Sequence, residues 1–220
     1  MSYLAITFPP DFSSENLFMA VTREAQVITP AEALSRLVTG NKRFVYGNPR
    51  YGHDVTQAAA TAGGQQPHSV VLGCIDSRVP LEAIFDQPFG SICVARSGAH
   101  VLDRSLIGSV GFAVAELGVS LVVVVGHQRC GAVNATVKAL RAGTVSEGEI
   151  GYLVDQLAPA VREVGIDDPD AAEKAIRAHV IRTTDRLHKV ESLAAAMAAG
   201  RINVVGAIYD LDSGWVEFLS

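Results

Sequence analysis

Residues 120–131 read SLVVVVGHQRCG, an unbroken apolar run that ends directly in a histidine, a cysteine and two glycines. Runs without polar alternation are typical of strands buried on both faces, as in parallel sheets covered by helices. Runs of the same kind, rich in β-branched residues, occur at 69–75, 91–95 and 202–209. Together the runs predict a mainly parallel β-sheet of four strands.

The segments between these runs carry helix signals. Thr29-Pro30 is typical of a helix start, with proline at the first helical position, and an apolar stripe of Leu34, Leu37 and Val38 follows before Gly40. Asp103 is the expected N-cap of a helix whose apolar residues recur at spacings of three and four up to Leu117. Further helices are predicted at 132–140 and 168–200, and a loop at 47–68.

The two ends of the chain complete the predicted architecture. Asp212-Ser213-Gly214 indicates a turn, after which the run at 215–219 would return as an antiparallel edge strand. Residues 1–28 show no period and are predicted to be an irregular N-terminal arm, whereas 29–220 are expected to form a single domain. The fold class is therefore α/β, with the mainly parallel sheet, an antiparallel edge strand, helices on both faces and an N-terminal helical arm.

Composition limits the class of protein. The chain has 220 residues, a net charge of −5 and a mean hydropathy of +0.26. The acidic balance offers no basic surface for phosphates, so we expect no nucleic-acid partner. The apolar runs fall short of the ~20 residues of a membrane helix, and residues 1–22 lack the basic start of a signal peptide. Three cysteines, an odd count, fit a reducing compartment, so we expect a cytoplasmic protein without membrane association.

Polar residues follow two of the predicted strands directly. Residues 74–78 read CIDSR, and residues 126–131 read GHQRCG. The carboxyl ends of parallel strands share one edge of a sheet, so we expect Cys74, His127 and Cys130 to meet. Two thiolates and an imidazole suit zinc, and a site with three protein ligands leaves one position for water, as in catalytic zinc sites. Taken singly, such cysteines are more often buried hydrophobes, and Cys93 is predicted to be one.

The motif Cys-x-Asp-x-Arg, followed far downstream by His-x-x-Cys-Gly, resembles the β class of carbonic anhydrases. Residues 40–44 (GNKRF), 64–67 (GQQP) and 209–211 (YDL) are also similar to that family. The resemblance implies an enzyme, a carbonate dehydratase and therefore a lyase. Its reaction would be the zinc-dependent, reversible hydration of carbon dioxide to bicarbonate and a proton by zinc-bound hydroxide.

The resemblance also implies roles for individual residues. Cys74, His127 and Cys130 would bind one Zn²⁺ per subunit, and Asp76 and Arg78 would form a carboxylate–guanidinium dyad. In the open form of such enzymes the fourth zinc ligand is water or hydroxide. In the closed, inactive form Asp76 would take that place as a metal ligand.

Assembly and substrate contacts follow from the same resemblance. Members form homodimers or dimers of dimers and build the active-site cleft partly from the partner subunit, so a homo-oligomer is expected here. Gln65 matches a glutamine beside the substrate, carbon dioxide or bicarbonate. Residues 96–100 read RSGAH, where the family commonly has Arg-Asn-Ala-Gly-Asn. The displaced glycine changes which residue can take a positive φ, so we expect this loop to run differently near Ser97 and Gly98.

Ligand charge predicts the working pH. Two thiolates cancel the charge of the zinc ion, so its bound water should be less acidic than at a three-histidine site, where the pKa is about 7. Activity should therefore rise through an alkaline pKa. Arg78 is expected to hold Asp76 off the metal through a bidentate ion pair, which leaves Asp76 free to orient the bound hydroxide.

Two other functions stay open from the sequence alone. The same scaffold could hydrolyse carbonyl sulfide or carbon disulfide, which are isoelectronic with carbon dioxide. The chain could also be a non-catalytic zinc protein, although a purely structural site would need none of Asp76, Arg78 and Gln65. The remaining histidines lack ligand spacing, and the sequence does not single out a proton shuttle among them.

Overall fold

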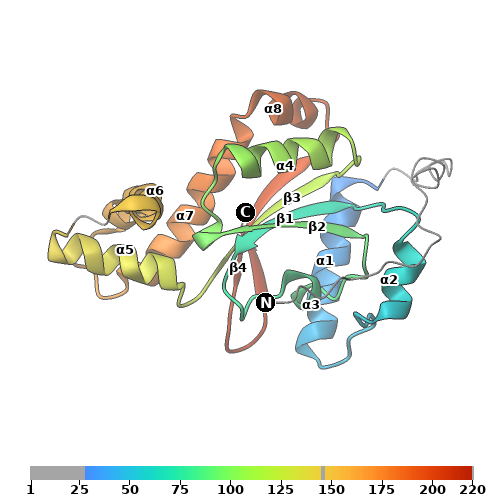
Figure 1. Cartoon of the computed structure of the whole chain (residues 1–220), viewed down its shortest axis with the longest axis horizontal. Helices are drawn as coiled ribbons and strands as arrows, with labels where there is room; N and C mark the ends of the chain where they lie inside the picture. The colour runs from blue at the N-terminus through green and yellow to red at the C-terminus, as the bar shows by residue number, and fades with distance from the viewer. Residues whose placement is uncertain (1–27, 145–146, 220) are drawn as a thin grey trace, which may run out of the picture.

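Five strands form one sheet through the centre of the protein (Figure 1). The computed structural model describes residues 28–144 and 147–219, so the predicted arm at 1–28 lies outside the described residues apart from Ile28. The strand order is β2–β1–β3–β4–β5. The strands are β1 (Ser69–Cys74), β2 (Ile92–Ser97), β3 (Leu121–His127), β4 (Asn203–Tyr209) and β5 (Val216–Leu219).

The pairing confirms the predicted fold class. The first four strands run parallel to their neighbours, and β5 pairs with β4 in the antiparallel sense. In register, Val70 lies opposite Val122, which in turn lies opposite Val204. Because β1 and β3 are parallel neighbours, their carboxyl ends, with Cys74 and His127, emerge at the same edge of the sheet.

Helices cover both faces of the sheet, as predicted (Figure 1). On β3, Val123 and Val125 pack on the face covered by α1 and α3, whereas Val122 and Val124 pack on the opposite face, toward α4, α7 and α8. The bounds of the helices are α1 (Pro30–Val45), α2 (Val55–Thr61), α3 (Leu81–Ile84), η2 (Gly98–His100), α4 (Arg104–Ala115), α5 (Gly131–Ala142), α6 (Gly148–Val164), α7 (Ala171–His188) and α8 (Glu191–Ala198).

Several helix predictions were wrong. The segment 47–68 contains α2, which buries no residue and so shows no apolar period in the sequence. Helix α6 was not predicted, because Pro159 lies inside it and hides the pattern, yet Leu157 and Val161 are buried and hold it in place. The region 168–200 is two helices, α7 and α8, separated at Lys189 and Val190.

Helix α1 begins at the predicted start and runs on through Gly40. Helix α1 continues to Val45, and its N-cap at Thr29 is a complete capping box with Glu32. A Cβ atom on Gly40 would lie 1.7 Å from the carbonyl oxygen of Phe85. Position 40 requires a glycine because α1 passes very close to the end of α3 at this point.

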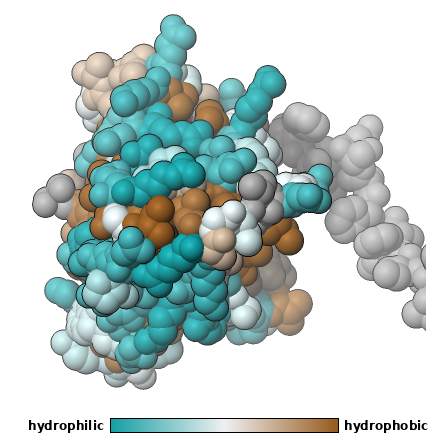
Figure 2. Space-filling view, turned by 90° about the vertical axis from the view of Figure 1, so that its left-hand side faces the viewer, coloured by the Kyte–Doolittle hydropathy of each residue, from teal (hydrophilic) through white to brown (hydrophobic). Residues whose placement is uncertain are grey.

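Helices α5 and α6 extend away from the sheet at one end of the molecule (Figure 1). Figure 2 looks onto that end and shows apolar residues in a band between hydrophilic ones. Inside, α5, α6 and α7 form a separate core cluster that also contains Cys74 and Cys130. Within the described residues, every helix is too short or too polar to span a membrane.

Candidate metal centre

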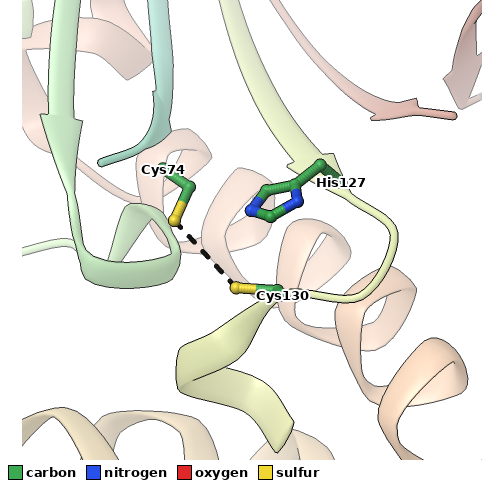
Figure 3. A group of neighbouring side chains, drawn as sticks. All are labelled: Cys74, His127 and Cys130. Carbon is green, nitrogen blue, oxygen red and sulfur yellow. Dashed lines mark hydrogen bonds between the residues drawn. The ribbon is translucent and has the colours of Figure 1, made fainter. Parts of the chain in front are cut away.

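Three potential ligands meet at the carboxyl edge of the sheet (Figure 3). Cys74 is the last residue of β1, His127 the last residue of β3, and Cys130 the N-cap residue of α5. All three are buried, with at most 4% of their surface exposed. The structure therefore brings together the three residues that the sequence spacing singled out.

Their geometry fits a tetrahedral ion. The Sγ atoms of Cys74 and Cys130 are 4.0 Å apart, and one ligand atom from each of the three residues lies within 4.8 Å of the others. Two thiolates on one zinc ion, at Zn–S distances of about 2.3 Å in tetrahedral geometry, would be roughly 3.8 Å apart. Both cysteines are free, and their separation is far beyond the length of a disulfide.

The imidazole of His127 is oriented for a metal. Its Nδ1 lies 2.9 Å from the carbonyl oxygen of Gln128, so Nδ1 carries the proton and donates it. Nε2 is buried without a partner among the described residues, on the side of the two thiols. A histidine that donates one N–H to a backbone carbonyl and presents the other nitrogen is the usual arrangement of a zinc ligand.

The two thiols shift each other's pKa in opposite directions. The S–H of Cys130 stabilises the thiolate of Cys74 and so lowers the pKa of Cys74. That thiolate, together with burial, raises the pKa of Cys130 far above its usual range. A dication between the sulfurs would relieve this conflict, because it lets both thiols ionise. The donor set therefore fits zinc.

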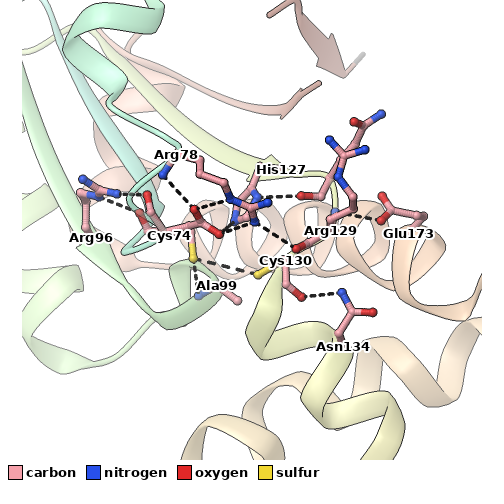
Figure 4. Close-up of polar contacts among 11 residues, drawn as sticks. Cys74, Arg78, Arg96, Ala99, His127, Arg129, Cys130, Asn134 and Glu173 are labelled. Atoms are coloured by element: carbon pink, nitrogen blue, oxygen red, sulfur yellow. Dashed lines mark hydrogen bonds and ion pairs between the residues drawn. The ribbon is translucent and has the colours of Figure 1, made fainter. Parts of the chain in front are cut away.

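Asp76 and Arg78 form a bidentate ion pair, and Figure 4 shows Arg78 beside the cluster. Hydrogen bonds from Arg78 hold the pKa of the Asp76 carboxyl well below its usual range. The Oδ2 atom of Asp76 is 4.0 Å from Nε2 of His127, so the carboxylate borders the cluster. Among the described residues, the ligand atoms that all lie within 4.8 Å of one another come from the two cysteines and the histidine, and the carboxylate oxygens of Asp76 are not among them.

Two further groups contact Cys74 in ways that the sequence did not predict. Arg96 reaches from β2 and donates to the carbonyl oxygens of Cys74 and Asp76, both at 2.6 Å. The backbone N–H of Ala99 donates to the sulfur of Cys74 at 3.3 Å. The parallel pairing of Cys74 with Ser97 is the signal that could have placed both residues there.

The loop between His127 and Cys130 is anchored from outside. Arg129 has a positive φ of 53° and makes a bidentate ion pair with Asp212, with both contacts at 2.8 Å. Its backbone N–H donates to Glu173 of α7 at 2.8 Å. Arg129 is therefore tied to the hairpin before β5 and to α7.

The loop at 96–100 takes its positive φ angles at residues other than glycine. Ala99 has φ 49° and ψ 39°, and His100 has φ 47°. Left-handed backbone costs residues with a Cβ roughly 1–2 kcal/mol each. A Cβ on Gly98 would lie 3.0 Å from a methyl group of Leu153 on α6, so the glycine at this position leaves room for the Leu153 side chain.

Gln65 and Cys93 lie away from the cluster. Gln65 is exposed and precedes β1, at the edge of the sheet opposite to Cys74, where the N–H of Gln66 pairs with Gly90. One chain alone therefore does not bring Gln65 to the three ligands. Cys93 lies within β2, half-buried, and burial raises the pKa of its thiol.

Known proteins share this sequence pattern. The family model described as carbonic anhydrase matches residues 69–216. Carbonic anhydrase 2 of Mycobacterium tuberculosis is 40% identical over 190 residues, which cover 84% of this chain and 90% of that protein. The carbonic anhydrase of Mycolicibacterium smegmatis is 38% identical over 196 residues, covering 87% of this chain and 94% of that protein.

Solved structures share the fold. The β-carbonic anhydrase CafA of Aspergillus fumigatus superposes with a TM-score of 0.64 at 25% identity, covering 86% of this chain and 90% of that one. A chain from the crystal structures of two tetrameric β-carbonic anhydrases of Sordaria macrospora matches with a TM-score of 0.65 at 22% identity, covering 86% of this chain and 96% of that one. The second likeness concerns the fold alone.

Proposed function

The chain belongs to the β class of carbonic anhydrases, lyases whose general reaction is the hydration of carbon dioxide, and we propose that Cys74, His127 and Cys130 hold the one Zn²⁺ per subunit that this reaction uses. The observation that carries the proposal is the unpartnered Nε2 of His127, buried and facing two thiols whose sulfurs are 4.0 Å apart. When bound, the ion would acidify a water molecule for attack on carbon dioxide.

The Asp76–Arg78 pair supports an open site. Arg78 occupies both carboxylate oxygens of Asp76, which keeps the carboxylate from turning toward the ligand atoms. Held in this way, Asp76 accepts a hydrogen bond from the attacking water and orients its lone pair. Its low pKa keeps it ionised, and so an acceptor, at all working pH values.

We propose that the active unit is a homodimer or a dimer of dimers. Strand β2 is an edge strand that pairs only with β1 within the described residues, and Phe112 of α4 is exposed beside it. Such an edge is a template for pairing with another chain. If β2 pairs antiparallel with β2 of a second copy, the start of the partner's strands, where Gln65 lies, comes to the edge that carries Cys74.

The test is stopped-flow hydration of carbon dioxide from neutral to alkaline pH, with zinc stoichiometry measured on the same sample. Cys74→Ser should lose zinc and activity together, whereas Cys93→Ser, the same change outside the cluster, should keep both. A zinc-replete protein without hydration activity would instead support a non-catalytic role. Release of sulfide from carbonyl sulfide in place of hydration would support the alternative hydrolase.

The proposed setting is the reducing cytoplasm. Cys74 and Cys130 must stay reduced to serve as thiolates, and both are free in the structure. Oxidation of the pair to a disulfide should therefore release the metal.

A further inference from the structure

Two buried histidines lie beside the turn that contacts Cys74. His100 belongs to η2 and His179 to α7, and their ring centroids are 4.7 Å apart with 33° between the ring planes. They are 2% and 4% exposed. In the described part of the chain, both ring nitrogens of His100 and the Nε2 of His179 have no hydrogen-bond partner. Thr183, one turn further along α7, has a buried hydroxyl in the same condition.

Apolar side chains would fill this space at lower cost, because a buried polar group without a partner loses its hydration for no gain. Burial is the main cause that lowers the pKa of His179, to about 4. Burial, with His179 nearby, also lowers the pKa of His100. Both rings are therefore neutral, and His179 contacts the turn through its stacking on His100, the residue that follows Ala99.

The turn at Ala99 needs a support of this kind. Ala99 and His100 are both left-handed without being glycine, with φ angles of 49° and 47°. Such backbone persists only where the surrounding structure enforces it. The turn aims one group at the metal centre, namely the N–H of Ala99, which lies 3.3 Å from the sulfur of Cys74 (Figure 4).

We infer that His179 is a positioning residue: by stacking on His100 it holds the turn in which the N–H of Ala99 donates to Cys74. The inference rests on the proposed metal centre. A hydrogen bond to a thiolate withdraws electron density from the sulfur, so the thiolate gives less charge to a metal and leaves it a stronger Lewis acid. The departure of this loop from the family pattern makes the support necessary, because alanine stands where glycine would adopt the turn without strain.

The direct test is nuclear magnetic resonance on the protein loaded with ¹¹³Cd²⁺. A scalar coupling between the Ala99 amide proton and cadmium, transmitted through the N–H···S contact, is expected in the wild-type protein. It should persist in Thr183→Val, a matched change on the same helix. It should vanish in His179→Leu, which keeps the volume and removes the polar ring.

Zinc affinity, measured by competition with a chromophoric chelator, gives a second readout. His179→Leu should bind zinc about 10–100-fold more weakly, as is usual when a group that orients a ligand is lost. His179→Phe, which keeps an aromatic ring for the stacking on His100, should recover part of the loss. If His179→Leu does not fold, His100→Asn takes its place, since asparagine tolerates the left-handed turn but lacks the stacked ring.

The outcomes separate this inference from the proposed function. Wild-type protein that takes up neither cadmium nor zinc overturns both. Wild-type protein that binds cadmium at the two thiolates, without coupling to the Ala99 amide, overturns the positioning role alone. The same holds if the substituted proteins keep the coupling and the full zinc affinity.

Discussion

Arg78 binds both carboxylate oxygens of Asp76, with Nε 3.0 Å from Oδ1 and Nη2 2.7 Å from Oδ2. The backbone N–H of Arg78 also donates to Oδ1 at 2.9 Å, and Nη2 reaches the carbonyl oxygen of Arg129 at 3.3 Å. One side chain thus connects the carboxylate that follows β1 to the loop that carries His127 and Cys130.

Removing this connection should separate metal binding from catalysis. In Arg78→Ala, Asp76 is free to turn onto the metal, so zinc content should persist while hydration falls by about 10–100-fold. Stopped-flow assays and metal analysis on one sample measure both quantities. Arg177→Ala breaks an ion pair with Glu217 outside the ligand cluster and should leave activity unchanged. Full activity in zinc-replete Arg78→Ala would refute the role of the pair.

Asp86 should make stability depend on pH in the acid range. Its buried carboxylate accepts the backbone N–H groups of Arg50 and Tyr51 at 2.9 and 3.0 Å, and it pairs with Arg43. Burial raises its pKa, but these hydrogen bonds outweigh burial and lower the pKa overall. The stabilisation is therefore complete above the unfolded pKa of about 4 and is lost as pH falls through the lower folded value.

Asp86→Asn tests this relationship. At neutral pH it should lower the free energy of unfolding by about 3 kcal/mol, because it removes the carboxylate from Arg43, which keeps only the backbone carbonyl oxygen of residue 86, and it places an amide N–H donor against other N–H donors. The difference from wild type should shrink as pH falls below about 4. Denaturant unfolding at several pH values measures it. Asp168→Asn, in an exposed pair with Lys174, should cost far less, and equal losses in both variants would contradict the argument.

Two glycine substitutions should act in opposite directions. Gly40→Ala would place a Cβ 1.7 Å from the Phe85 carbonyl oxygen, so α1 must move away from α3 and the protein should lose several kcal/mol, roughly as for overpacked cores. Gly111→Ala in α4 meets nothing within 4 Å and should gain about 0.5–1 kcal/mol from helix propensity. Thermal unfolding of both proteins checks the signs, and a stable Gly40→Ala would show that α1 passes α3 less closely.

Ala99 should tolerate glycine but not valine. In Ala99→Gly, relief of roughly 1–2 kcal/mol of left-handed strain offsets about 0.8 kcal/mol of lost methyl burial and about 0.4–1 kcal/mol of added chain entropy. Its stability should therefore stay within about 1 kcal/mol of wild type. Ala99→Val puts a β-branched side chain at φ 49° in a fully buried place and should cost more than about 2 kcal/mol. Equal stabilities of the two variants would contradict the turn geometry.

Strands and ligands could be predicted because their signals are local. An apolar run such as Val122 to Val125 has one stable environment, the interior of a covered parallel sheet, and chemistry-bearing residues directly after two such runs must emerge at one edge. Helix α6 could not be predicted, since Pro159 breaks its pattern and only packing against α5 and α7 compensates. The need for glycine at position 40 could not be predicted for a related reason: it comes from Phe85, a residue distant in the chain.

The sequence by itself determined that a mainly parallel sheet forms and that Cys74, His127 and Cys130 follow its strands at one edge. Both are read from apolar runs and from the residues directly after them, which are local features of the chain. Only the tertiary structure decided what surrounds them. The N–H of Ala99 on the sulfur, Arg96 on the carbonyl of Cys74 and the histidine pair behind the turn depend on which strands and helices become neighbours in space. Hydrogen bonds and packing act over a few ångströms, so contacts between distant segments exist only once the chain has folded.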